Sequence, residues 1–154
     1  MAHLFDELDP IGKIGEAAAL DLLKGRSLAI RKVDFKKEAF DIQTVSHKGI
    51  IHNWEIKTVK EVSTPWDFYT LELEQLNVSE ASRIPAHIRH CNDIDYMAYW
   101  DCNRKELLVY KTKALIGWAL ENKEKVFTIR SGTAKVIRFP RHSIDAGYCG
   151  TKKK

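Results

Sequence analysis

Two oppositely charged side chains stand two residues apart within an apolar stretch of this 154-residue chain, where Glu55 and Lys57 alternate with Trp54 and Ile56. Side chains of an extended strand alternate between its two faces, so Glu55 and Lys57 are expected to share one face. A carboxylate and an ammonium group side by side on such a segment either face water or line a functional site. Asp41, earlier in the chain, supplies a second carboxylate.

The elements around these residues predict how they meet. Residues 40–45 and 50–59 have the pattern of strands, and the turn residues 46–49 between them predict a β-hairpin. Roughly equal numbers of residues separate Asp41 and Glu55 from the turn. We therefore expect Asp41 to lie opposite the segment that carries Glu55 and Lys57.

A third acid lies on a predicted helix. Residues 11–23 have helical periodicity, with Asp9 as the expected N-cap and Pro10 at the first helical position. Glu16 borders the apolar stripe of this helix. It is either an additional acid of the same site or a boundary residue whose carboxylate reaches water.

Asp41 followed by Glu55-Ile56-Lys57 resembles the active-site motif of the PD-(D/E)xK nuclease superfamily, which includes type II restriction enzymes, Holliday-junction resolvases and phage nucleases. Phe40 replaces the usual proline, which removes no chemical group. The position of Glu16 is similar to that of an additional acid in many members. The resemblance covers about residues 10–122 and implies a restriction-endonuclease-like α/β fold, with a mixed central sheet flanked by helices.

Carboxylate oxygens are the ligands that Mg²⁺ prefers, and we expect Mn²⁺ to substitute. The resemblance implies that Asp41, Glu55 and the backbone carbonyl of Ile56 bind this metal. Lys57 is expected to orient or help deprotonate the attacking water, and its role as the base stays open. Glu16 is expected to orient that water or complete a second metal position.

The rest of the chain continues the α/β pattern. Residues 27–32 and 67–73 predict strands, and residues 79–91 predict a short helix interrupted by Pro85. Residues 96–101 and 107–110 predict a second hairpin, and residues 112–122 an amphipathic helix. The last thirty or so residues carry no such prediction.

Composition favours one domain over residues 1–154, because 44% of the residues are hydrophobic and no linker or repeat divides the chain. We expect a disordered tail from about residue 150. No segment resembles a signal peptide or a membrane span, so a cytoplasmic protein, of a bacterium or of a phage-infected cell, is expected. Three isolated cysteines predict no disulfide-linked partner and lack the spacing of a zinc site.

The net charge of +4 is modest but fits DNA as the partner. The cations expected to contact DNA are Lys13, Lys36, Lys37, Lys60, Arg83 and Arg89. A small catalytic domain usually acts on two strands as a symmetric dimer, so we predict a homodimeric endonuclease selective for branched DNA. An exonuclease, a restriction or nicking enzyme and a non-catalytic nucleic-acid-binding module remain alternatives.

Overall fold

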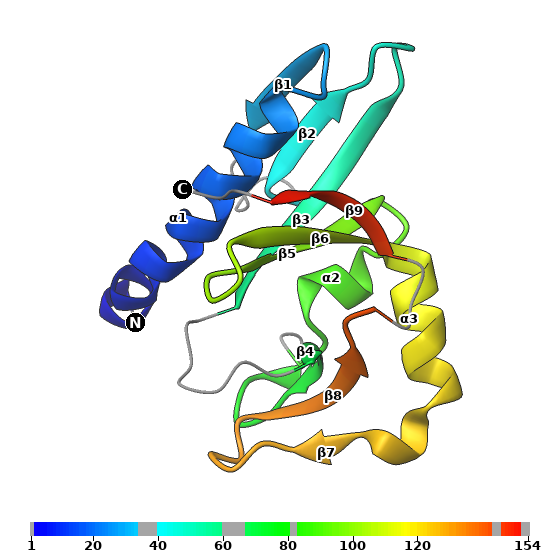
Figure 1. Ribbon diagram of the computed structural model, residues 1–154. Coiled ribbons are helices and arrows are strands. Elements are labelled where there is room, and N and C mark those ends of the chain that lie inside the picture. Colours follow the sequence, from blue (N-terminus) through cyan, green and yellow to red (C-terminus); the bar gives the residue numbers. More distant parts are fainter. Residues whose placement is uncertain (1, 34–39, 60–66, 81–82, 143–145, 152–154) are drawn as a thin grey trace.

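The computed structural model describes the backbone of residues 2–33, 40–59, 67–80, 83–142 and 146–151. The elements run in the order α1 (Ala2–Lys24), β1 (Ala29–Lys32), β2 (Ile42–Val45), β3 (Ile51–Val59), β4 (Phe68–Gln75), α2 (Ala86–Arg89), β5 (Tyr96–Asp101), β6 (Glu106–Lys111), α3 (Thr112–Glu121), the 3₁₀ helix η2 (Lys123–Lys125), β7 (Phe127–Thr128), β8 (Ala134–Pro140) and β9 (Ala146–Thr151) (Figure 1).

Six strands form the main sheet in the order β1-β2-β3-β5-β6-β9. Only β3 and β5 pair in parallel, and the other neighbours in this sheet are antiparallel. A second, antiparallel sheet has the order β4-β8-β7. The predicted α/β fold with a mixed sheet and flanking helices is therefore confirmed.

Different elements pack on the two faces of the main sheet. On one face, Ala18, Ala19 and Leu23 of α1 pack against Ile42 and Trp54 of the sheet. Gly15 lets the helix approach β3 closely, because a Cβ at this position would overlap Oγ1 of Thr58. On the other face, a second core joins the main sheet to the second sheet and α3, with Tyr69, Leu71, Tyr99, Leu108, Tyr110, Leu115, Ile137 and Phe139 among its buried members.

The first helix is longer than predicted. It begins at Ala2 and continues through Pro10, so the expectation of Asp9 as its N-cap is wrong. A proline within a helix removes one backbone hydrogen bond and crowds the preceding turn, but it does not always end the helix. Leu4, Glu7 and Leu8, which precede Pro10, are residue types with high helix propensity.

The predicted helix over residues 79–91 is also wrong in extent, since α2, its α-helical part among the described residues, covers Ala86–Arg89, and residues 81–82 lie outside the described residues. Pro85 precedes its first residue, and the Pro85 carbonyl accepts hydrogen bonds from the backbone N–H groups of Ile88 and Arg89. The fixed φ of proline thus starts the helix rather than interrupting it. The carbonyl of Arg83 instead accepts from the backbone N–H of Gln75, which ties this part of the chain to β4.

The C-terminal part, which carried no prediction, supplies β7 and β8 of the second sheet and the edge strand β9 of the main sheet. Gly150 and Thr151, near which the disordered tail is expected to begin, pair with β6. Residues 152–154 lie outside the described residues. No helix among the described residues is long and apolar enough to cross a membrane.

Candidate active site

Asp41 is held against β3 by both its backbone and its side chain. Its backbone N–H donates to the carbonyl of Trp54 at 2.9 Å. Its carboxylate Oδ2 accepts a hydrogen bond from the backbone N–H of Ile56, also at 2.9 Å. The carboxyl groups of Asp41 and Glu55 lie close enough to act on each other's pKa, so the predicted proximity of these two acids is confirmed.

Lys57 completes this group. Its Nζ lies 3.6 Å from Oε1 of Glu55. Trp54 and Ile56 are buried in the core under α1, while Glu55 and Lys57 remain partly exposed, which confirms the predicted alternation. We refer to Asp41, Glu55 and Lys57 as the acid–lysine group.

Burial and charge oppose each other at the two acids. Burial raises the pKa of Glu55 to about 8, although the charge of Lys57 acts in the opposite direction. Burial likewise raises the pKa of Asp41, against the hydrogen bond from Ile56 and the charge of Lys57. The protein therefore disfavours having both carboxyl groups ionised unless further positive charge is present.

These two acids fit a divalent cation. They bring two hard oxygen ligands together at a partly buried position, as a Mg²⁺ site with one or two carboxylates requires. Within the described part of the chain, no group of three or more His, Cys, Asp or Glu side chains gathers as a metal site. A third carboxylate, imidazole or thiolate ligand is therefore not supplied by this part of the chain.

Glu16 does not complete such a cluster with Asp41 and Glu55. Its carboxylate Oε2 lies 3.2 Å from Nζ of Lys32, on β1. Lys32 is directly opposite Ile42 in the sheet, and its charge slightly opposes the rise in the pKa of Asp41 that burial causes. Glu16 is thus connected to Asp41 through Lys32.

Sequence reasoning missed two neighbours of the acid–lysine group, Lys32 and His87. Lys32 falls within a predicted strand, but only the pairing of β1 with β2 places it opposite Ile42, the residue that follows Asp41. His87 of α2 is buried, and one ring nitrogen, Nε2, lies 2.7 Å from the carbonyl oxygen of Glu72. Burial lowers the pKa of His87 to about 4, and the charge of nearby Lys57 contributes to this. No local sequence signal marks it as a neighbour of Lys57.

The cations predicted to bind DNA are dispersed. Lys13 is exposed on α1. Arg83 pairs with Glu74 at 3.6 Å, and Nε of Arg89 donates to the carbonyl of Ile84 at 2.9 Å. Lys36, Lys37 and Lys60 lie outside the described residues.

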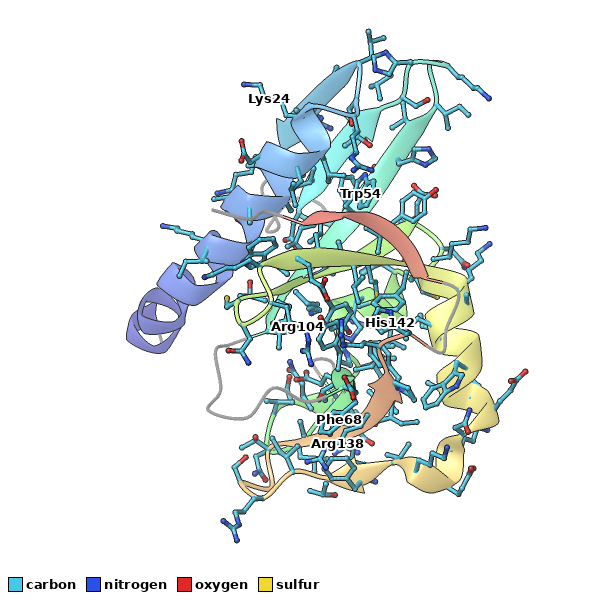
Figure 2. All side chains as sticks on the ribbon, in the orientation of Figure 1. Lys24, Trp54, Phe68, Arg104, Arg138 and His142 are labelled. Atoms are coloured by element: carbon cyan, nitrogen blue, oxygen red, sulfur yellow. The ribbon has the colours of Figure 1, made fainter. Side chains whose placement is uncertain are left out.

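Two further arginines, Arg104 and Arg138, make contacts with other side chains (Figure 2). Arg138 lies over the rings of Phe68 and Phe127, with 4.8 Å from Cζ to each ring centroid, on the second sheet. Arg104 bonds to the buried Asp101 at 2.8 Å. Neither was predicted to contact DNA.

Comparison with known proteins places this geometry within a known fold. No protein-family model matches the sequence, and no curated protein matches it significantly. Among solved structures, the bacterial homing endonuclease I-Ssp6803I matches with a TM-score of 0.55 and 16% sequence identity, covering 85% of this chain and 76% of that chain. The chain has a restriction-endonuclease-like fold. The fold implied by the motif resemblance is therefore confirmed, and the roles of the individual residues remain predictions.

In this restriction-endonuclease-like fold, the acid–lysine group lies where β3 pairs with the segment leading into β2. The arrangement presents two carboxyl groups and an ammonium group to one partly exposed position. Such a group can bind a hard cation and an anionic substrate together.

Proposed function

We propose that this protein is a metal-dependent DNA endonuclease that hydrolyses phosphodiester bonds at the acid–lysine group. The observation that carries this proposal is the contact between the Asp41 and Glu55 carboxyl groups, with Lys57 3.6 Å from Glu55, within a restriction-endonuclease-like fold. Paired acids with raised pKa values next to a lysine are typical of catalytic sites.

Asp41 and Glu55 hold Mg²⁺ in this proposal, together with the backbone carbonyl of Ile56, and Mn²⁺ substitutes for it. When bound, the cation supplies charge stabilisation at the scissile phosphate. The hydrogen bond from the Ile56 N–H fixes one oxygen of Asp41, which orients the other for a ligand. Lys57 contacts the scissile phosphate or the attacking water through its ammonium group.

Glu16 has a supporting role in the proposal. It positions Lys32 beside Asp41, or it turns from Lys32 to orient water or to contribute to a second metal position. Both alternatives place α1 at the border of the site, and the Gly15 contact with Thr58 keeps the helix close to β3.

We further propose that the enzyme acts as a homodimer on branched DNA. A compact catalytic domain that cuts two strands generally does so with two-fold symmetry. A structural neighbour described as a homing endonuclease supports internal cleavage rather than digestion from an end. Sedimentation velocity at micromolar concentration tests the dimer, and a single monomeric species with and without a four-way junction would contradict it.

Cleavage of a labelled DNA panel tests the nuclease. Single-stranded, duplex, flap and four-way-junction DNA are each incubated with the protein and Mg²⁺ or Mn²⁺, with EDTA as a control. Glu55→Gln is expected to lower the rate by at least about a hundredfold, because it removes a metal ligand. Glu124→Gln, the same change at an exposed position of η2, is the matched control and should cleave normally.

The substrate that is cut fastest distinguishes a junction-selective enzyme from a single-strand, end-directed or nicking enzyme. DNA binding without cleavage of any substrate, by folded protein under either metal, would instead support a non-catalytic binding module. Equal cleavage by the Glu55→Gln variant would disprove the assignment of the acid–lysine group.

A further inference from the structure

One face of β1, β2 and β3 carries the acid–lysine group and a set of polar side chains next to it. Directly paired residues of antiparallel strands share a face, as do alternate residues of one strand. Asn53 therefore lies on the same face as Glu55 and Lys57. Gln43 is opposite Asn53, and Arg31 is opposite Gln43.

These three side chains form a hydrogen-bonded row across the strands. Nε of Arg31 donates to Oε1 of Gln43 at 2.8 Å, and Nε2 of Gln43 donates to Oδ1 of Asn53 at 2.9 Å. Asn53 is fixed in turn, because its Nδ2 donates to the carbonyl of Asp93 at 2.9 Å. The row is thus ordered before any ligand arrives, which lowers the entropy cost of binding.

A second row lies two residues farther toward the hairpin turn, formed by Ala29, Val45 and Ile51. Ala29 is exposed, and Ile51 has 59% of its surface exposed. We call the two rows, Arg31–Gln43–Asn53 and Ala29–Val45–Ile51, the open face. α1 packs on the opposite side of these strands, and the second sheet lies at the other end of the molecule from the β2–β3 hairpin (Figure 1).

The chemistry of the open face fits a nucleic-acid strand. Arginine, glutamine and asparagine are among the side chains that contact phosphates and base edges. Only one of the five N–H donors of Arg31 is used in the row. Two lysines flank the polar row: Lys57 follows it along β3, and Lys48 lies in the exposed hairpin turn. Asp93 and Asp95 border the row beyond Asn53 and limit the surface on that side.

The spacing of residues along β3 also matches the spacing of base pairs along DNA. Two residues along a strand span about 7 Å, which is roughly two base-pair steps along a duplex. The polar row therefore lies about two nucleotide steps from the acid–lysine group along a bound duplex.

We propose that the open face binds duplex DNA and positions the nucleotides next to the bond that is cleaved at the acid–lysine group. This inference rests on the proposed nuclease function for the role of the acid–lysine group. The contact with DNA itself can be measured without cleavage.

Binding of a fluorescent duplex, followed by anisotropy in EDTA so that no cleavage occurs, gives the first test. The double variant Arg31→Gln, Gln43→Ala is expected to bind about tenfold more weakly, with a smaller dependence on salt, because a phosphate contact is lost. Arg130→Gln, at an exposed position in the turn between β7 and β8, removes the same charge elsewhere and is expected to change affinity less than about twofold. Equal weakening by both variants would overturn the proposal.

Photocrosslinking gives a second test that does not depend on the folding of the double variant. p-Benzoylphenylalanine replaces either Ile51, on the open face, or Leu120, which has a similar exposure of 60% on α3. Crosslinks to DNA are expected from position 51 and not from position 120. Crosslinks from position 51 to a second copy of the chain, or equal DNA crosslinking from both positions, would overturn the proposal.

The two tests separate this inference from the nuclease itself. Metal-dependent cleavage that the open-face variants leave unchanged would overturn the open face and keep the nuclease. Crosslinking from position 51 by a protein that cuts no DNA would keep the open face and overturn the nuclease.

Discussion

Glu55 is the residue at which the demands of folding and of the proposed chemistry conflict most directly. Its carboxyl group is buried enough to raise its pKa to about 8, yet the proposed metal site needs it ionised. Without metal, the folded protein keeps this group protonated over a pH range in which the unfolded chain ionises it. Stability and metal binding should therefore both depend on pH.

Glu55→Gln is expected to stabilise the metal-free protein at neutral and mildly alkaline pH. The pKa of Glu55 is about 8 when folded and about 4.5 when unfolded. The contribution of its protonated form to the free energy of unfolding is therefore fully present below pH 4.5 and is lost as the pH rises to about 8. The variant should therefore gain stability over wild type as the pH rises between these limits, by a few kcal/mol and at most about 5 kcal/mol. Urea unfolding in EDTA from pH 4 to 9 measures this. A stability difference that does not change with pH would show that Glu55 is ionised in the folded protein.

Lys32 offers a second prediction at this scale. It lies beside Asp41 and pairs with Glu16, so its charge repels a cation at the acid–lysine group. Lys32→Met is expected to tighten Mn²⁺ binding by roughly two- to fivefold and to change stability by less than about 1 kcal/mol, because the pair is partly exposed. Calorimetric titration measures the affinity, with Lys24→Met, at the exposed last position of α1, as the control (Figure 2). Weaker binding in Lys32→Met would mean that Lys32 holds Glu16 in place for the metal.

The contact between α1 and β3 determines how the first helix meets the site. Gly15 faces Thr58, while Gly12, one turn earlier, has no atom within 4 Å of the position of a Cβ. The same substitution should therefore have opposite effects at these two positions, since alanine favours a helix and a clash opposes it.

Gly12→Ala is expected to stabilise the protein by about 0.5–1 kcal/mol through helix propensity. Gly15→Ala is expected to destabilise it by about 1–2 kcal/mol, because the new methyl group must displace Thr58 and move the helix from β3. Thermal unfolding of both variants provides the measurement. A stabilising Gly15→Ala would show that Thr58 turns aside at little cost.

At the scale of the whole molecule, a buried polar cluster joins the two sheets. Asp101 of β5 accepts hydrogen bonds from the hydroxyl of Tyr69, on β4, and from Nη1 of Arg104, both at 2.8 Å. Burial alone would raise the pKa of Asp101, but the hydrogen bonds from Arg104 and Tyr69 lower it below its ordinary value. The cluster therefore stabilises the packing of the second sheet in the ionised state of Asp101.

Asp101→Ala is expected to destabilise the protein by about 3–5 kcal/mol, since it leaves the Tyr69 hydroxyl and the Arg104 guanidinium without their buried acceptor. Tyr69→Phe should cost about 1–2 kcal/mol. Asp67→Asn, which removes a 94% exposed partner of the same arginine, is the control and should cost less than about 1 kcal/mol. Comparable losses for Asp67 and Asp101, measured by urea unfolding, would contradict this account.

The sequence by itself determined the local elements near the proposed site. Alternating apolar residues and a turn ending in Gly49 predicted the β2–β3 hairpin, and the same alternation placed Glu55 and Lys57 on one face. These features depend on periodicity and on turn conformation, which are properties of neighbouring residues. The restriction-endonuclease-like fold followed from the motif that these residues carry.

Only the tertiary structure decided which distant segments meet. The parallel pairing of β3 with β5, the second sheet built from β4, β7 and β8, and the pairing of β9 with β6 all join segments far apart in the sequence. The contact of Glu16 with Lys32 and the row of Arg31, Gln43 and Asn53 depend on the register between strands. Periodicity shows which face of a strand is buried but not which strand lies beside it, because that choice depends on the packing of the whole core.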